Sequence, residues 1–293
     1  MADGPPSSVA ILVREDCPPA LDLARALHAR LRELGIRPWL GRHDGSNTLQ
    51  GAMPETDLAL VLGGDGTFVS VARGLMGRNI PLAGINFGRV GFLSCVAPAS
   101  WREFLEDLLA GRLHPEPRLA LRWEHLRRGR RLASGWAVNE VLVSRRDTAR
   151  LASLSLAVNK GPLLRLRADG ILLATPTGSS GYARSAGGPL LFPSLQAYVA
   201  VAICPFLCLF PPLVLDGEAG CRVAIGAGSL MLTLDGQETR AVREEDIIEV
   251  RGEPGAYRVI AQNEDSYLSR LSKVGFILEE ARTPLREGTR EKQ

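Results

Sequence analysis

Residues 58–67 read Leu58-Ala-Leu-Val-Leu-Gly-Gly-Asp-Gly-Thr67, an apolar run that breaks into three glycines around one carboxylate. The continuous Leu, Ala and Val residues from Leu58 to Leu62 are typical of a strand covered on both faces of a parallel sheet. Gly63 and Gly64 place no side chain just beyond the carboxyl end of this strand, where open α/β sheets bind their ligands. The stretch therefore predicts a strand leading into a ligand-approach loop, and an ordinary Gly/Asp turn remains the alternative.

Asp65 is the unusual residue of this loop. After Gly66 the apolar residues take a helical spacing, which places Thr67 near a helix N-terminus whose free N–H groups favour an anion. A carboxylate beside a bound phosphate repels it, unless the carboxylate works through a cation or accepts a proton from an attacking hydroxyl. Both roles indicate phosphoryl transfer rather than binding alone.

The remainder of the chain divides into regions that differ in their predicted secondary structure. Strands are expected at 9–13, 36–40 and 81–86, with a helix at 18–34. This alternation predicts an α/β domain with a parallel sheet over residues 1–98. Short strands take over from about residue 115, so residues 99–262 are predicted to form a mostly β domain, and residues 263–293 form a tail with a weakly helical start.

Three later stretches place polar residues among apolar ones. They are Asn139-Glu140 within the apolar run 136–143, Asp169-Gly170 with the turn 175–182, and Asp235-Gly-Gln237. Buried amides and carboxylates are costly without partners, so Asn139 and Glu140 belong either to a satisfied structural network or to a site. The hydroxyl-rich turn 175–182 suits a ligand with many hydroxyls, such as a ribose, although each stretch alone is also consistent with a simple turn.

Composition excludes several classes of protein. The chain has 293 residues, 45% of them hydrophobic and 23% charged, which is typical of a globular protein, and its net charge of +3 does not favour nucleic acid. The arginine cluster 127–131 has no interleaved aromatic residues and is expected at a hairpin tip. The apolar window 199–215 contains three prolines and is too short for a bilayer span. No secretory signal is visible, so we expect a cytoplasmic protein without membrane or nucleic-acid partners, and its five cysteines are expected to be buried, reduced thiols.

Taken together and in this order, the motifs resemble those of the NAD kinase family over nearly the whole chain. Residues 63–67 resemble the GGDGT motif, residues 86–92 the loop after it, and Asn139-Glu140 the NE pair. Asp169-Gly170 with residues 175–182 resembles the D-G and T-P-T-G-S-T-A-Y block, and residues 235–237 resemble the late D-G-Q. GGDGT alone is shared with lipid kinases and phosphofructokinases, but its combination with NE and TPTGS is specific.

The resemblance implies a fold and an activity. The fold is an N-terminal α/β domain, a C-terminal β domain and a tail that returns to the first domain. The activity is transfer of the γ-phosphoryl of ATP, or of a phosphoryl of inorganic polyphosphate, to the 2′-hydroxyl of the adenosine ribose of NAD. The family also implies a divalent cation, expected to be Mg²⁺ entering with ATP, with no ligands assigned. A homodimer or homotetramer is expected, with part of window 199–215 at an interface.

The resemblance also assigns residues by position. Asp65 resembles the proton acceptor. The residues that resemble substrate and nucleotide contacts are Gly63, Gly64, Gly66, Thr67, Phe92, Asn139, Glu140, Arg150, Arg167, Asp169, Thr177, Ser180, Gly181, Tyr182, Ala183, Arg184, Ser185 and Gln237. Of these, Arg150, Arg167 and Gln237 match the less distinctive positions. The chain departs from the family at Ser180-Gly181, where Thr-Ala is usual, and at Phe206, where histidine is frequent.

Other functions share part of this pattern. A GGDGT-type lipid kinase would need an apolar groove for acyl chains, and nothing around residues 139–182 supplies one. A non-catalytic NAD(H)-binding module would keep Asn139, Glu140 and Asp169 but would make Asp65 dispensable. An arginine-rich nucleic-acid binder would show a steeply salt-dependent affinity for DNA.

Overall fold

Four parallel strands with helices between them form the N-terminal domain. The computed structural model describes residues 5–43, 53–88, 91–94, 96–146, 151–207, 210–261 and 267–277. The first elements are β1 (Ser8–Arg14), α1 (Pro18–Glu33), β2 (Arg37–His43), β3 (Leu58–Gly63), α2 (Asp65–Gly74) and β4 (Leu82–Asn86). The strands lie in the order β2-β1-β3-β4, and every pair is parallel. The predicted α/β domain with a parallel sheet is confirmed.

Strand β3 lies at the centre of this domain because both of its faces are covered. All six of its residues are buried. Leu58, Leu60 and Leu62 pack in one apolar cluster with α1, and Ala59 and Val61 pack in another with α2. Helix α3 (Trp101–Leu109), which follows the short 3₁₀ turn η1 (Pro98–Ser100), packs in the α1 cluster although it comes after residue 98.

The C-terminal domain is mostly antiparallel β, as predicted. Its strands are β5 (Glu116–Arg127), β6 (Arg130–Ala137), β7 (Glu140–Arg145), β8 (Ala152–Val158), β9 (Leu164–Ala168), β10 (Gly170–Ala174), β11 (Ala197–Ile203), β12 (Leu213–Asp216), β13 (Gly220–Ile225), β14 (Leu230–Leu234), β15 (Glu238–Val242) and β16 (Asp246–Val259). Six of them form a sheet in the order β12-β11-β10-β7-β14-β15. The others join a ten-stranded sheet, and residues of both sheets share one buried apolar cluster.

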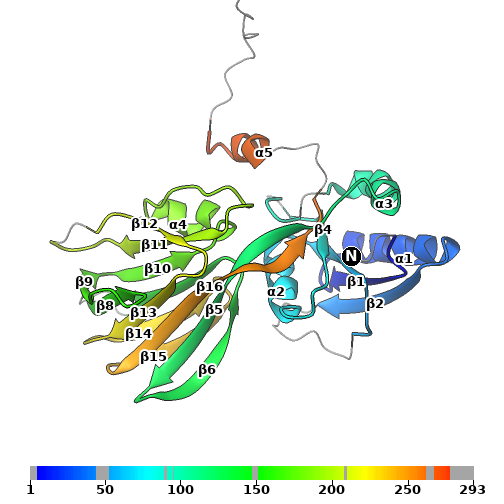
Figure 1. Ribbon diagram of the computed structural model, residues 1–293. Helices are drawn as coiled ribbons and strands as arrows, with labels where there is room; N and C mark the ends of the chain where they lie inside the picture. The colour runs from blue at the N-terminus through cyan, green and yellow to red at the C-terminus, as the bar shows by residue number, and fades with distance from the viewer. Residues whose placement is uncertain are drawn as a thin grey trace, which may run out of the picture. The chain divides into compact units, whose positions relative to one another are not determined.

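Strand β16 connects the two domains within the ten-stranded sheet. It pairs antiparallel with β5 and β13, and its last residue, Val259, pairs parallel with Leu82 of β4 (Figure 1). The strand runs through Gly252-Glu-Pro-Gly255, a sequence that is typical of a turn. The register between β16 and β5 shifts between Glu253 and Tyr257, and the pairing of the two strands resumes at Tyr257.

The apolar run 136–143 is divided between two strands, near the boundary between the short strands that the sequence predicts at 132–137 and 138–144. Strand β6 ends at Ala137 in the ten-stranded sheet, and β7 begins at Glu140 in the six-stranded sheet. Between them, Val138 and Asn139 donate their backbone N–H groups to the carboxylate of Asp235 instead of to a neighbouring strand. The chain changes sheets at this point, and the polar pair Asn139-Glu140 marks the crossing.

Other expectations have mixed outcomes. Arg128 (φ 49°) and Gly129 (φ 76°) form the tip of the β5–β6 hairpin, as predicted for the arginine cluster. Cys221 is buried and Cys17 is partly buried, but Cys204 is exposed, so the expectation of buried thiols is wrong there. Cys204 lies in the turn that follows β11, at the edge of the fold. Cys95 and Cys208 lie outside the described residues.

Residues 263–293 form a unit separate from residues 1–262. In this second unit the described part contains helix α5 (Tyr267–Lys273), which confirms the helical start predicted for the tail. No described helix combines the length and the apolar character that crossing a membrane requires.

Candidate functional site

The GGDGT loop forms where β3 meets α2, at the carboxyl edge of the parallel sheet. Gly63 is the last residue of β3, Gly64 is the N-cap of α2, and Asp65 opens the helix. A Cβ added at Gly63 would lie 2.7 Å from Oγ1 of Thr67, so a larger residue would displace the first turn of α2. The first turn and its free N–H groups are therefore held at the sheet edge, as the sequence predicts.

Asp65 binds the backbone of the loop that follows β4. Its Oδ2 accepts the N–H of Phe92 at 3.0 Å, and its Oδ1 accepts the N–H groups of Leu93 and Ser94, both at 3.0 Å. A carboxylate has about four acceptor positions, so about one remains for another donor. The partly buried Asp65 thus holds the 92–94 loop and can still accept one further hydrogen bond.

Three side chains tie the helix of the GGDGT loop to the C-terminal domain, and we call Arg73, Asp235 and Gln237 the interdomain link. Nη1 of Arg73, in the last turn of α2, lies 2.8 Å from Oδ2 of Asp235, in the turn between β14 and β15. Gln237 accepts a hydrogen bond from Nη2 of Arg73 at 3.0 Å and donates one to the carbonyl of Gly66 at 2.9 Å. The D-G-Q turn therefore contacts both ends of α2.

The same carboxylate of Asp235 holds the NE pair. It accepts the backbone N–H groups of Val138 (3.1 Å), Asn139 (2.7 Å) and Glu140 (3.1 Å). Burial raises the pKa of Asp235, and the three N–H donors with Arg73 oppose that rise. Burial, reinforced by the charge of Asp235, also raises the pKa of Glu140 to about 7.

The TPTGS turn packs against the NE pair from the other side. Oγ1 of Thr175 donates to the carbonyl of Val138 at 2.6 Å, and its N–H donates to the carbonyl of Asn139 at 2.9 Å. A Cβ at Gly178 would lie 2.2 Å from the carbonyl oxygen of Asn139, so only glycine fits there. The hydroxyl of Thr177 lies 3.2 Å from that of Tyr257. Hydrogen bonds thus connect four motifs into one cluster: the GGDGT loop, the NE pair, the TPTGS turn and the D-G-Q turn.

The turn continues into the predicted 180–185 segment. Ser180 ends the 3₁₀ turn η2 (Gly178–Ser180), and residues 182–185 form the short helix α4 (Tyr182–Ser185). Tyr182 is 45% exposed, whereas Ala183 is buried. Gly181, Arg184 and Ser185 are exposed, so this segment presents most of its side chains to solvent beside the cluster.

Asp169 and Arg167, two of the predicted contacts, lie near the end of β10 that is distant from the NE pair. Ala174 pairs with Glu140, and Gly170 pairs with Ser144. Asp169 precedes Gly170 and therefore lies five residues, roughly 17 Å, along the strand from the residue that faces Glu140. There both carboxylate oxygens of Asp169 bind Arg145 at 3.0 Å. Arg167 is exposed, with its guanidinium 5.7 Å from the ring centroid of Phe206, the residue that replaces a frequent histidine. Arg150 lies outside the described residues.

A cavity of about 680 Å³ adjoins the first turn of α2. It is lined by Arg14, Glu15, Asp16, His43, Gly66, Thr67, Ser70 and Gln237. Arg14 is paired with Asp16, and Nε2 of His43 lies 3.0 Å from Oγ of Ser70. Sequence reasoning missed Arg14 and His43, although both end parallel strands at the edge where ligands bind, and that position was the available signal.

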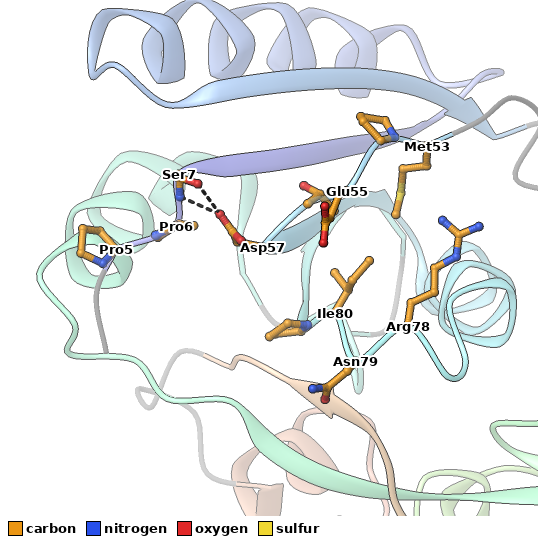
Figure 2. Close-up of a pocket in the computed structure, with 12 residues that line it drawn as sticks. Pro5, Pro6, Ser7, Met53, Glu55, Asp57, Arg78, Asn79 and Ile80 are labelled. Atoms are coloured by element: carbon orange, nitrogen blue, oxygen red, sulfur yellow. Dashed lines mark hydrogen bonds between the residues drawn. The ribbon is translucent and has the colours of Figure 1, made fainter. Parts of the chain in front are cut away.

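A second cavity, of about 760 Å³, lies at the amino ends of β1, β3 and β4 (Figure 2). Its lining includes Pro5, Pro6, Met53 and Arg78. None of the predicted site residues is among the described residues that line this cavity. Oδ2 of Asp57 accepts the hydroxyl of Ser7 at 2.8 Å there, together with the N–H groups of Ser7 (2.8 Å) and Ser8 (3.0 Å), and these hydrogen bonds lower the pKa of Asp57. These bonds tie β1 to β3 at the edge opposite the GGDGT loop.

Within the described ranges, no group of three or more His, Cys, Asp or Glu side chains is arranged to hold a metal ion. Mg²⁺ in phosphoryl-transfer sites is usually held by one or two carboxylates together with substrate phosphates.

The α/β domain has a glycine loop that opens a helix, and an ion pair and hydrogen bonds tie this helix to polar motifs of the β domain. These features define a class: two-domain nucleotide-binding proteins with a GGDGT motif. Comparison with known families makes the assignment specific. Residues 9–113 match the ATP-NAD kinase N-terminal domain, and residues 138–262 match the ATP-NAD kinase C-terminal domain. The chain belongs to the NAD kinase family.

Individual relatives agree with this assignment. The chain is 41% identical over 277 residues to the NAD kinase of Nitratidesulfovibrio vulgaris (strain DSM 19637 / Miyazaki F), which covers 94% of this chain and 98% of the relative. It is 32% identical over 272 residues to the NAD kinase of Treponema denticola, with 92% and 96% coverage.

Solved structures share the fold. An NAD kinase from Archaeoglobus fulgidus in complex with ATP superposes with a TM-score of 0.70 at 26% identity, covering 92% of this chain and 99% of that one. Yeast NADH kinase complexed with NADH superposes with a TM-score of 0.82 at 22% identity, covering 96% and 91%.

Proposed function

We propose that this protein is an NAD kinase that transfers the γ-phosphoryl of ATP to the 2′-hydroxyl of the adenosine ribose of NAD, giving NADP. The observation that carries the proposal is the hydrogen-bonded cluster of four motifs, in which one turn, 235–237, contacts both the GGDGT helix and the NE pair. The family membership supports the same activity. Neither a lipid kinase nor a non-catalytic NAD(H)-binding module has support from the relatives.

Asp65 is the proposed proton acceptor. The oxygen of the 2′-hydroxyl attacks the γ-phosphorus, the bond from that phosphorus to the bridging oxygen breaks, and ADP leaves with the bonding electron pair. The hydroxyl proton passes to the acceptor position that Asp65 retains beyond its three backbone bonds. The same bonds fix the carboxylate in one orientation, which favours catalysis by positioning.

The donor is proposed to occupy the cavity of about 680 Å³ beside α2, with its phosphates toward Gly66 and Thr67. The free N–H groups of the helix N-terminus would face the phosphates. Mg²⁺ bound to the phosphate oxygens would neutralise the charge that develops during transfer. Because Arg14 is already paired with Asp16 and Glu15 lies beside them, the lining suits a compact Mg-bound triphosphate better than a long polyphosphate.

The dinucleotide is proposed to bind along the NE pair and the 175–185 turn. Asn139 and Glu140 would contact the adenosine half, and the exposed segment 180–185 would surround the nicotinamide half. Asp169 and Arg167 lie at the far end of β10, so they would contact a more distant part of the ligand or a site completed by a second copy. A cytoplasmic homodimer or homotetramer is part of the proposal, with the exposed Phe206 and Val214 of window 199–215 at an interface.

The test is mass spectrometry of the products after the purified chain is incubated with NAD and either Mg-ATP or Mg-polyphosphate. We expect a gain of one phosphoryl on NAD with ATP, and phosphatase-sensitive NADP as the product. Transfer from polyphosphate alone would contradict the proposed donor. No phosphorylated dinucleotide with either donor would refute the proposed function.

A further inference from the structure

The pair of Arg73 and Asp235 is unusually buried for an ion pair. Their side chains are 8% and 0% exposed, and Nη1 of Arg73 lies 2.8 Å from Oδ2 of Asp235. Desolvating two charges is costly unless further hydrogen bonds satisfy the remaining acceptors. Asp235 meets that requirement by accepting three consecutive N–H groups, those of residues 138–140.

The backbone at Asp235 adopts a conformation that L-residues rarely take. Its φ is +52°, and Gly236 follows with a φ of +65°. This turn points the carboxylate of Asp235 away from solvent and toward the crossing between the two sheets. A two-residue hairpin turn with positive φ at both positions favours Asp-Gly, so the turn accommodates Asp235. The turn alone does not require a 0% exposed carboxylate, which the partners of Asp235 stabilise.

The interdomain link joins two parts of the proposed site that the reaction must bring together. On one side are Gly66 and Arg73, near the two ends of the ten-residue helix α2, which Asp65 opens. On the other side are Asn139 and Glu140, whose backbone the same carboxylate holds. A single buried charge thus bonds the helix of the proposed proton acceptor and the backbone of the proposed dinucleotide contacts.

We propose that Asp235, acting with Arg73 and Gln237, is a positioning residue that sets the separation between Asp65 and the NE pair, and so between the reacting hydroxyl and its proton acceptor. This inference rests on the proposed NAD kinase activity. The interdomain link touches neither reacting atom. Its loss changes geometry, and a misplacement of about 1 Å can lower a reaction rate by about 100-fold.

The experiment compares two disruptions of the interdomain link with a matched disruption elsewhere. Arg73→Met and Asp235→Asn each break the buried pair, and Arg73→Lys keeps the charge beside Asp235 while losing the fork that also reaches Gln237. The matched control is Arg127→Met, because Arg127 pairs with Asp246, another carboxylate that is 0% exposed, where the last residue of β5 faces the first residue of β16. Formation of NADP gives kcat and KM, and thermal unfolding gives Tm for each variant.

We expect Arg73→Met and Asp235→Asn to lower kcat at least about tenfold with KM for NAD within about threefold, the pattern of lost transition-state positioning. The double variant should be no slower than the slower single variant, because residues that act as a unit are not additive. Arg127→Met should lower Tm with kcat within about twofold. Arg73→Lys, which is the mildest change, should lie between the wild type and Arg73→Met.

Each other outcome decides against the inference. If the interdomain-link variants lose only Tm, as Arg127→Met does, Asp235 is structural and the inference is wrong. If Asp235→Asn does not fold, Arg73→Lys carries the test, and an unchanged kcat there overturns the inference. A wild-type chain that makes no NADP refutes the proposed function and the inference together, whereas an active wild type with unchanged variants refutes only the inference.

Discussion

The replacement Asp65→Asn tests the proposed chemistry most directly, because it keeps the size of the side chain and removes its basicity. The carboxylate accepts N–H groups from Phe92, Leu93 and Ser94. An asparagine can keep its oxygen on Leu93 and Ser94, but its NH₂ group then faces the N–H of Phe92. One of three backbone bonds is lost, and the other two no longer involve a charge.

These losses set the expected magnitudes. A hydrogen bond to a charged group contributes about 1.5 to 3 kcal/mol. For a chain of this size a loss of about 2 kcal/mol lowers Tm by about 4 to 8 °C. Removal of a general base lowers the rate about 10²- to 10⁴-fold, so we expect kcat to fall at least about 100-fold while KM for NAD changes only a few-fold. Stability and catalysis therefore change by amounts that can be measured separately.

The assay follows NADP formation at saturating Mg-ATP, with Tm measured on the same preparations. Asp57→Asn is the matched control, because Asp57 also accepts backbone N–H groups, from Ser7 and Ser8, at the opposite end of β3. It should lose a comparable Tm and keep kcat within about twofold. A folded Asp65→Asn variant with near-native turnover would refute the assignment, and Glu140 or Asp169 would then have to be tested as the base.

Three further outcomes are expected. Because burial and Asp235 raise the pKa of Glu140 to about 7, its ionisation opposes folding, so stability should be lost as pH rises through about 7. Glu140→Gln should remove that loss, of up to about 1.4 kcal/mol per pH unit, in melts from pH 4 to 8, and identical slopes would contradict it. Asp169→Ala should weaken NAD binding about 10- to 100-fold and ATP binding little, and unchanged NAD affinity by calorimetry would remove Asp169 from the site. Light scattering at micromolar concentration should report a multiple of 31.6 kDa, and a monomer alone would reject the oligomer.

Short sequence patterns predicted the elements whose formation depends on neighbouring residues in the chain. The apolar run 58–62 is followed at once by glycines and a helical spacing, and the structure places β3 and α2 there. The glycines of the motifs also have steric causes, because a Cβ at Gly63 would meet the side chain of Thr67 and one at Gly178 would meet the backbone of Asn139. The motifs themselves could be located in the sequence, and the structure shows the hydrogen bonds that join them.

Long-range pairing could not be predicted in the same way. Asp235 precedes a glycine, as in many ordinary turns, and its partners Val138, Asn139 and Glu140 lie 95 to 97 residues away in the chain. Arg73 reads as an exposed helical cation and is almost fully buried. One sequence contains no information on which distant residues neutralise each other. The same limitation concealed the separation of Asp169 from the NE pair, which follows from strand register.

The change of sheet at residues 138–139 explains why the NE and D-G-Q motifs are hydrogen-bonded to each other. Where β6 ends and β7 begins, the backbone N–H groups have no strand to bond, and each buried N–H left unpaired costs about 1 to 3 kcal/mol. The carboxylate of Asp235 satisfies three of them, so the chain can leave one sheet and enter the next without that penalty. The interruption frees Asn139 and Glu140 from a continuous apolar strand, with their backbone held by Asp235. The polar pair can therefore exist inside an apolar β domain only because a distant turn contributes one buried charge, and Arg73 is the cation that makes this charge tolerable.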